Sequence, residues 1–335
     1  MQTEHKIKLT SAEVANIWTA FQGDTMSICV FEFFLIHVED KEIRSVVEFA
    51  MQLSQAHVQR LTAFFREEKL TIPNGFTVEE DVNKQAPMLF TDDFMLFYIQ
   101  NMGKLGLKSY TLSLSNSARL DMCEYFTECL NESAKLFNKA TEIMLSKGTF
   151  IRAPYVPESM MVEYIHKDSS VAGWFSEKRP LNVIEMSSIY FNMIQNQLGR
   201  TLTMGFSQVA KSQKVRDYLV RGRDISDKHV EIFGSVLSED HLPATSAWST
   251  LPTNSIIAPF SDKLMMFHVV TLNGIGIANY GASAGTSMRH DLGIIYVRLA
   301  AEVAKFAGSG LDIMMENAWL EQPPQAADRD KLAKR

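Results

Sequence analysis

The chain has 335 residues, of which 46% are apolar and 21% are charged, with a formal net charge of −6. This composition is typical of a soluble globular protein, and the length suffices for two domains of ordinary size. The negative charge, without any stretch rich in lysine and arginine, argues against a nucleic-acid partner, because neutralising phosphates requires a basic face.

The first predicted element is a helix over residues 11–38, which contains the most apolar run of the chain, MSICVFEFFLIHV at 26–38. That run carries Glu32 and is shorter than the roughly 20 residues that a membrane-spanning helix needs, so we expect no membrane span. The N-terminal sequence MQTEHKIKLTSAEV lacks the apolar core of a secretion signal, which favours a cytoplasmic location.

A second helix is predicted over residues 41–69, because apolar residues recur there at alternating steps of four and three. The positions of this stripe are Ile43, Val47, Ala50, Ser54, His57, Leu61 and Phe64. The stripe is expected to face a core. Ser54 and His57 are therefore predicted to be buried polar groups.

Two more helices are predicted over residues 92–115 and 117–147. They follow a polar, proline-containing segment of about 20 residues, far more than a tight helix hairpin needs, so the segment is expected to cross the length of the bundle. Four helices with a long crossover after the second form the ferritin-like topology. The predicted fold class is all-α, built from a ferritin-like four-helix bundle.

The chain contains two copies of this four-helix unit. A shift of 172 residues aligns His57 with His229, and after a two-residue gap a shift of 170 aligns Glu132 with Glu302. Many matches at a nearly constant shift indicate an internal duplication. The predicted organisation is a first bundle at 9–150, a linker at 151–180, a second bundle at 181–322 and a flexible tail at 323–335.

Buried polar residues of the second and fourth helices are the candidate functional groups. Ferritin-like bundles hold two metal ions with a Glu from each of two helices and a Glu-x-x-His from each of the other two. Here the second helix carries Ser-x-x-His and the fourth Glu-x-x-Lys, while the middle of the first helix, with Gln22, Thr25 and Met26, is taken to supply no carboxylate. The candidate metal ligands are His57, Glu132, His229 and Glu302.

Three explanations of the His and Glu pair stay open. The first is a buried hydrogen-bonded pair in which Ser54 satisfies the second imidazole nitrogen. The second is a reduced, single-ion site for iron, manganese or zinc. The third is general acid–base catalysis. No substrate pocket is indicated, so no catalytic residue is assigned; an enzyme of this kind would be a metal-dependent oxidoreductase of the ferritin-like class.

Other repeated polar residues are predicted to support the bundles. The tyrosines are expected to send their hydroxyls to a buried partner, and the aspartates lie in the first turn of a helix, where a carboxylate is favoured. These supporting residues are Ser54, Ser226, Tyr110, Tyr280, Asp121 and Asp291. Ion pairs are expected at the bundle ends, between Glu13 and Arg119 and between Glu185 and Arg289.

The small residues receive structural interpretations. Gly106 and Gly276 stand in mid-helix, where glycine is costly, and they are expected to mark a close approach of helices. The three cysteines have no C-x-x-C spacing and are interpreted as reduced thiols, with Cys29 and Cys129 filling the core. No P-loop, zinc-protease, serine-hydrolase or EF-hand motif is found.

With its duplication, its Ser-x-x-His helices and the segments PFSDKLMMFH (259–268) and ENAWLEQPPQAADRD (316–330), the chain resembles a known family. This is the two-repeat ferritin-like family of unknown function from spore-forming Gram-positive bacteria, some of whose members are labelled "putative spore coat protein". The resemblance implies the bundle fold and no activity. It leaves two hypotheses: a non-catalytic protein of assembly or interaction, associated with the spore and partnered by a spore protein or a second copy, and a metal-binding descendant of the di-iron carboxylate proteins.

Overall fold

The structure is a computed structural model that describes residues 7–156, 164, 179–244 and 252–333. The first half contains α1 (Ser11–His37), α2 (Lys41–Glu67), the short α3 (Val78–Asp81), α4 (Asp92–Ser115) and α5 (Leu120–Ser146). The second half contains α6 (Val183–Val209), α7 (Gln213–Glu239), α8 (Asp262–Thr286), α9 (His290–Glu316) and the short α10 (Arg329–Ala333). The predicted all-α fold of two tandem helical bundles is confirmed.

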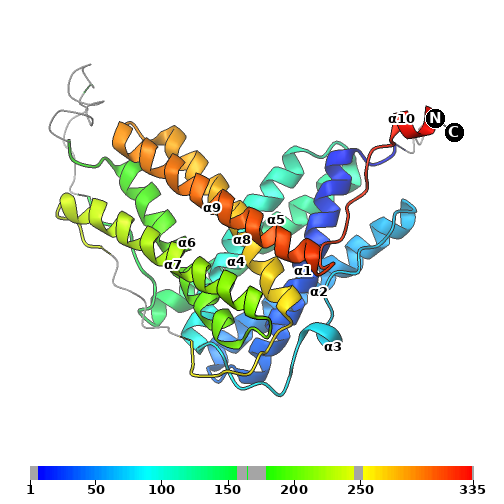
Figure 1. Cartoon of the computed structure of the whole chain (residues 1–335), viewed down its shortest axis with the longest axis horizontal. Helices are drawn as coiled ribbons and strands as arrows, with labels where there is room; N and C mark the ends of the chain where they lie inside the picture. The colour runs from blue at the N-terminus through cyan, green and yellow to red at the C-terminus, as the bar shows by residue number, and fades with distance from the viewer. Residues whose placement is uncertain (1–6, 157–163, 165–178, 245–251, 334–335) are drawn as a thin grey trace.

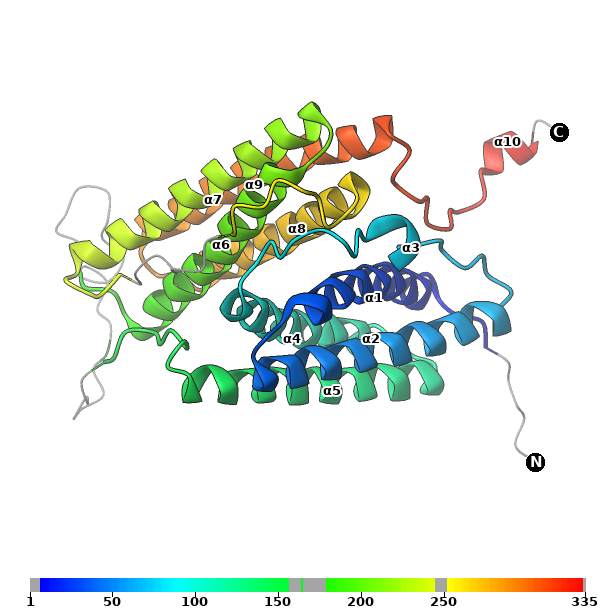
Figure 2. The ribbon, with the colours of Figure 1, turned by 90° about the horizontal axis from the view of Figure 1, so that it is seen from below.

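The two bundles form the arms of a V (Figure 1). Among the described residues each arm contains four long helices. The crossover segments run along the side where the arms meet, as seen from below in Figure 2. No helix of the described residues is both long and apolar enough to cross a membrane. Most of the predicted linker at 151–180 lies outside the described residues.

Matching capping boxes begin the first helix of each half. The side chains of Thr10 and Glu13 bond to each other's backbone N–H at the start of α1, and Asn182 and Glu185 do the same at the start of α6. In a capping box two N–H groups that the helix leaves unpaired are satisfied reciprocally. The same local sequence solution therefore fixes where both bundles begin.

The second oxygen of the Glu13 carboxylate ties α1 to α5. It accepts hydrogen bonds from the backbone N–H groups of Ala118 (3.0 Å) and Arg119 (2.9 Å). Burial by itself opposes the charged carboxylate, but these bonds and those from Thr10 lower the pKa of Glu13 to about 2. The predicted contact between Glu13 and the Arg119 side chain is wrong, because the guanidinium instead pairs with Asp121 and Glu68.

The second half repeats this correction. Glu185 accepts the backbone N–H groups of Met288 and Arg289, while its side-chain ion pair is with Arg179. The Arg289 guanidinium pairs with Asp291 at 2.7 Å. The carboxylates of Glu13 and Glu185 thus bond to backbone N–H groups that a helix start leaves unpaired. Matching opposite charges along the sequence does not predict these bonds.

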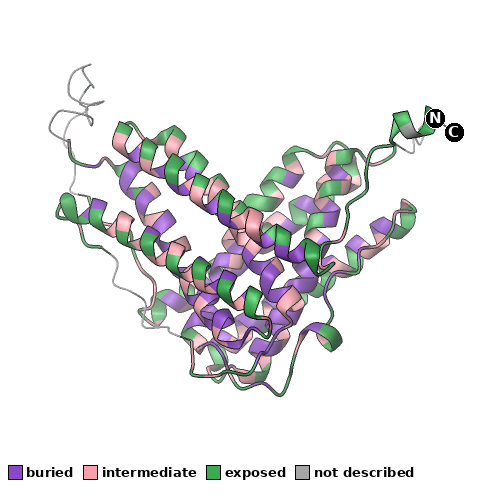
Figure 3. Cartoon of the chain, in the orientation of Figure 1, coloured by how far each residue is buried: buried purple, intermediate pink, exposed green. Residues whose placement is uncertain are grey.

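One hydrophobic core joins the two halves. It includes Phe33, Phe34 and Phe94 from the first half and Phe206 and Met265 from the second, all at most 1% exposed. Two smaller clusters fill the outer parts of the arms. Figure 3 shows the buried residues gathered where the arms meet.

Equivalent residues of the two copies meet inside this shared core. The Tyr98 hydroxyl of α4 lies 3.1 Å from Nε2 of His268 of α8, and the two positions align at the shift of 170. Contact between equivalent positions is the mark of a two-fold relation, here between the halves of one chain. Burial lowers the pKa of His268 to about 3, so this imidazole is neutral.

The crossover segments add backbone bonds between the halves. Val82 and Phe260 form an isolated antiparallel bridge, and the Asn83 N–H donates to the Pro259 carbonyl at 2.8 Å. The Thr253 N–H donates to the Leu89 carbonyl at 2.9 Å. The long connections that close each bundle therefore also fasten one bundle to the other.

The repeated mid-helix glycines differ between the copies. A Cβ at Gly106 would stand 2.3 Å from Oγ of Ser133, as expected for a close approach of α4 and α5. A Cβ at Gly276 would meet nothing within 4 Å. The expected close approach is confirmed at Gly106 and wrong at Gly276, where α8 borders open space.

Candidate metal centre

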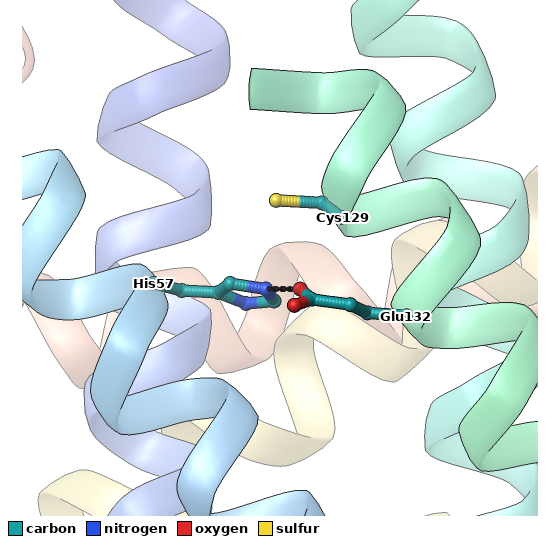
Figure 4. A group of neighbouring side chains, drawn as sticks. All are labelled: His57, Cys129 and Glu132. Carbon is teal, nitrogen blue, oxygen red and sulfur yellow. Dashed lines mark hydrogen bonds and ion pairs between the residues drawn. The ribbon is translucent and has the colours of Figure 1, made fainter. Parts of the chain in front are cut away.

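His57 lies in the middle of the first bundle and is 7% exposed. Its Nε2 atom is 2.8 Å from Oε2 of Glu132, which reaches across from α5 (Figure 4). Both residues belong to inward-facing stripes, since the neighbouring stripe positions Leu61 of α2 and Leu136 of α5 are also buried. The structure therefore brings this predicted pair together.

The other imidazole nitrogen faces α1 and α4. Nδ1 of His57 lies 3.4 Å from Asp24 and 3.3 Å from the hydroxyl of Tyr110, which itself donates to Asp24 at 3.4 Å. Asp24 is 8% exposed. The expectation that Ser54 satisfies this nitrogen is wrong, and so is the expectation that the middle of the first helix supplies no carboxylate.

The carboxylates set the charge of His57. Burial opposes protonation, but hydrogen bonds with Asp24, Cys129 and Glu132 outweigh it and raise the pKa of His57 well above its ordinary value. A cation between two carboxylates is favoured where water is excluded. The two carboxylates therefore favour the protonated form of the His57 imidazole.

Cys129 completes the group. It lies three residues before Glu132 on the same face of α5, and its Sγ lies within 4.8 Å of the candidate ligand atoms of His57 and Glu132. Burial raises the pKa of the Cys129 thiol, although His57 opposes this rise. Within the described ranges, these three residues are the one group of His, Cys, Asp and Glu side chains close enough to share an ion.

A tyrosine lies beside the group. The ring of Tyr125 packs edge-on against His57, with 6.2 Å between ring centroids. Burial raises the pKa of Tyr125, and a hydrogen bond with the Cys129 thiol contributes to this rise. The Tyr125 hydroxyl therefore belongs to the same buried polar group as Cys129.

The second bundle has the equivalent His and Glu pair but lacks the equivalents of Asp24 and Cys129. Nε2 of His229 lies 3.1 Å from Oε2 of Glu302, and Nδ1 lies 2.9 Å from the Tyr280 hydroxyl. Asn196 occupies the position of Asp24 and donates to that hydroxyl at 2.7 Å. Burial now dominates, so the pKa of His229 is lowered despite the contact with Glu302.

Two more substitutions separate the copies. Leu299 occupies the position of Cys129 and contributes to the apolar cluster of the second arm. Lys228, which replaces Ala56, forms an ion pair with Glu302. The second bundle therefore lacks the thiol and engages its carboxylate with a lysine.

The remaining predicted support residues lie elsewhere or act differently. Asp121 and Asp291 bind the guanidinium groups of Arg119 and Arg289 at the starts of α5 and α9. Ser226 lines a cavity of the second bundle. Of the support residues, only Tyr110 and Tyr280 contact the histidines.

Sequence reasoning missed Asp24 and Cys129. Neither stands out in its own helix, because α1 is apolar on most sides and a buried cysteine resembles a small apolar residue. A usable signal was the comparison of the two copies. At the shifts that preserve His57 and Glu132, the polar Asp24 and Cys129 change to Asn196 and Leu299.

Comparison with known proteins identifies a family without an assigned activity. Residues 1–162 and 169–332 each match the family model described as "Protein of unknown function (DUF3231)". Among curated proteins, none matches the chain. A crystal structure from Bacillus halodurans, described as a "putative spore coat protein", is similar with a TM-score of 0.41 and 19% identity, covering 45% of this chain and 98% of that chain.

Proposed function

The chain belongs to the DUF3231 family, and we propose that it is a metal-binding protein that holds one divalent ion in its first bundle. The ligands are His57, Cys129 and Glu132. The observation that carries the proposal is the convergence of a nitrogen, a sulfur and an oxygen donor within 4.8 Å of one another in a bundle core.

The donor set favours zinc. Thiolate and imidazole suit zinc, whereas manganese prefers carboxylate, carbonyl and water oxygens, and iron(II) lies between them. Three protein ligands leave a fourth position of a tetrahedral zinc site for water. The contact of 2.8 Å between Nε2 and Oε2 must widen to admit an ion, because zinc binds nitrogen and oxygen donors at about 2.0 Å each.

Asp24 and Tyr110 suit the role of holding the imidazole. Metal-binding histidines commonly donate their other ring N–H to a carboxylate, which fixes the ring and raises its basicity as a ligand. Asp24 and Tyr110 lie at 3.4 Å and 3.3 Å from Nδ1, on the side of the ring opposite Glu132. Nε2 is thereby left to bind the ion, which must displace the proton that this nitrogen shares with Glu132 when no ion is bound.

An ion can reach the site past Glu132. The Glu132 side chain is 33% exposed, whereas the His57 side chain is 8% exposed. One donor therefore contacts solvent while the imidazole and thiol lie inside. This exposure would give an ion an entry path, which a metal site requires.

The proposal assigns no ion to the second bundle. His229 and Glu302 were predicted ligands, but Leu299 removes the sulfur, Asn196 removes the carboxylate behind the ring, and Lys228 competes for Glu302. The Lys228 ammonium beside the Glu302 carboxylate disfavours the binding of a metal cation there. The expected stoichiometry is one ion per chain. Association with the spore, with a second copy or a spore protein as partner, stays a prediction.

Metal analysis of protein purified without a histidine tag tests the proposal. We expect nearly one zinc per chain by inductively coupled plasma mass spectrometry, and loss of most of it in Cys129→Ser and in Glu132→Gln. The matched control is His229→Ala with Glu302→Gln, which removes the equivalent pair and should leave the metal content unchanged.

Two results would contradict this function. Metal-free protein that also fails to take up added zinc, iron(II) or manganese would leave His57 and Glu132 as a structural hydrogen-bonded pair. Equal metal loss in the first-bundle variants and the second-bundle control would place the ion elsewhere. Replacement by cobalt adds a spectroscopic check, because a thiolate-to-cobalt charge-transfer band should be present in the wild type and absent in Cys129→Ser.

A further inference from the structure

The second bundle contains a cavity of about 80 Å³ beside its His229 pair. Residues of α6, α7, α8 and α9 line it, including Tyr280 and Ser226. An engineered cavity of about 150 Å³ accommodates the six carbon atoms of benzene, so this one has room for about three non-hydrogen atoms. The first bundle has Ser133 packed against Gly106 where the second has Val303 and Gly276.

Small residues keep the cavity open. Gly199, Gly222 and Gly276 line it, and a Cβ on Gly276 would meet nothing within 4 Å. Gly276 costs helix stability, because glycine has high conformational freedom when unfolded. A Cβ on Gly222 would stand 2.7 Å from Phe306 and one on Gly199 3.3 Å from Ser226, so close packing explains those two glycines. At Gly276 no such contact requires glycine, and the space beside it stays open.

Carboxamides dominate the polar part of the lining, and no acidic side chain among the described residues takes part. The carboxamide residues are Asn192, Gln195, Asn196, Asn273 and Asn279. Nδ2 of Asn196 and Nδ2 of Asn273 donate to the hydroxyls of Tyr280 and Tyr218. The side-chain oxygen of Asn279 accepts from Lys108 at 2.9 Å, which leaves its NH₂ group as a donor.

Two lysines lie at a smaller hollow of about 20 Å³ next to the cavity. The hollow shares Gln195 and Asn279 with the cavity, and Lys104 and Lys108 of α4 line it from the first half of the chain. Burial, with a contribution from Lys108, lowers the pKa of Lys104 to about 8. No acidic side chain of the described residues lines this hollow either, so its positive charge is not neutralised there.

We propose that the cavity and hollow together bind a short-chain carboxylate of about the size of acetate or glycolate. The carboxylate group faces Lys104, Lys108 and the NH₂ group of Asn279. The carbon end lies among Leu198, Leu272 and Ile275, which line both spaces. This division into apolar walls and a few convergent polar groups is typical of small-molecule sites, and it fits a carboxylate better than an inorganic anion.

Binding of sodium acetate and sodium glycolate to the full-length chain tests the proposal, followed by isothermal titration calorimetry and by thermal unfolding. We expect saturable binding that is weakened at least about tenfold by Lys104→Met. Gly276→Val should weaken it by a similar factor while leaving the protein folded, because the new side chain enters the cavity. The matched control is Gly274→Val, an exposed position two residues away on α8 that does not line the cavity.

Binding of acetamide and of inorganic phosphate tests which features of the site recognise the ligand. Acetamide that binds as tightly as acetate would overturn the role of the lysines, and inorganic phosphate that binds as tightly would overturn the role of the apolar walls. Acetate binding that is unaffected by Gly276→Val would place the ligand outside the cavity. Absence of binding by both carboxylates at millimolar concentrations would overturn the proposal. Metal content, measured in parallel, should not change in Gly276→Val, so the two sites are tested separately.

Discussion

Single-residue differences shift the pKa values of the two histidines in opposite directions. His57 and His229 each contact a glutamate through Nε2 and a tyrosine hydroxyl near Nδ1. Behind the ring, the first has the carboxylate of Asp24 and the second has the amide of Asn196. The pKa is therefore raised at His57 and lowered at His229, because burial dominates when the second carboxylate is missing.

Exchanging the two residues should move both pKa values. In metal-stripped protein, Asp24→Asn should lower the pKa of His57, whose other titratable neighbours are Tyr110, Tyr125, Cys129 and Glu132. Asn196→Asp should raise the pKa of His229, because a carboxylate near Nδ1 favours the imidazolium. Titration of the imidazole resonances by nuclear magnetic resonance measures both changes.

The sign of the pH dependence follows from these directions. A raised pKa at His57 stabilises the fold below the ordinary pKa of 6.5, and this contribution is lost as the pH rises through the folded value. The lowered pKa at His229 acts oppositely, and its contribution is lost as the pH falls. An unchanged His57 titration in Asp24→Asn would show that Glu132 alone holds the proton.

At the level of the helices, the equivalent glycines Gly106 and Gly276 have different surroundings. Gly106 lets α5 approach α4, because Ser133 fills the space where a Cβ would stand. Gly276, its equivalent in α8, borders a cavity. Both copies thus have glycine at this position, but close helix packing requires it only at Gly106.

A pair of alanine substitutions should separate these purposes. Gly276→Ala should stabilise the protein by about 0.5 to 1 kcal/mol, since alanine is the better helix former and its Cβ meets nothing. Gly106→Ala should destabilise it by about 1 kcal/mol, since overpacking against Ser133 exceeds the same helix-forming gain. Urea unfolding followed by circular dichroism measures both. A stabilising Gly106→Ala would mean that Ser133 turns aside at little cost.

The sequence predicts where the helices lie along the chain. It predicts only in part which face of each helix points into the bundle. The predicted helix at 41–69 and the observed α2 (Lys41–Glu67) nearly coincide, because its apolar stripe is narrow and regular. In α1 the apolar residues surround most of the helix, so no stripe indicates which polar residue faces inward. Asp24 was missed for that reason. The contact of the His57 Nδ1 atom with Tyr110 depends on how α4 packs against α2, which the stripe of α2 alone does not indicate.

For the whole molecule, the shared core is expected to make the two bundles unfold as one cooperative unit. The crossovers bond to each other, and Glu321 near the C-terminus accepts hydrogen bonds from Gln22 and from the backbone of Asn74 and Gly75 in the first half. Contacts between halves are thus distributed from the core to the chain end. Separating the arms would expose large aromatic side chains to water, at a cost of roughly 25 cal/mol per Å² of apolar surface.

The substitution Tyr98→Phe should weaken both bundles equally. It leaves Nε2 of buried His268 without its partner, whose loss is expected to cost about 1 to 3 kcal/mol. Because Tyr98 belongs to the first half and His268 to the second, hydrogen exchange in urea, followed by mass spectrometry, should show peptides of both arms losing protection together. The shift to lower urea should be the same in each arm. The exposed Tyr155→Phe is the control and should leave both arms unchanged. Loss of protection in one arm while the other persists would mean that the arms are separate folding units and that their shared core is a docking surface.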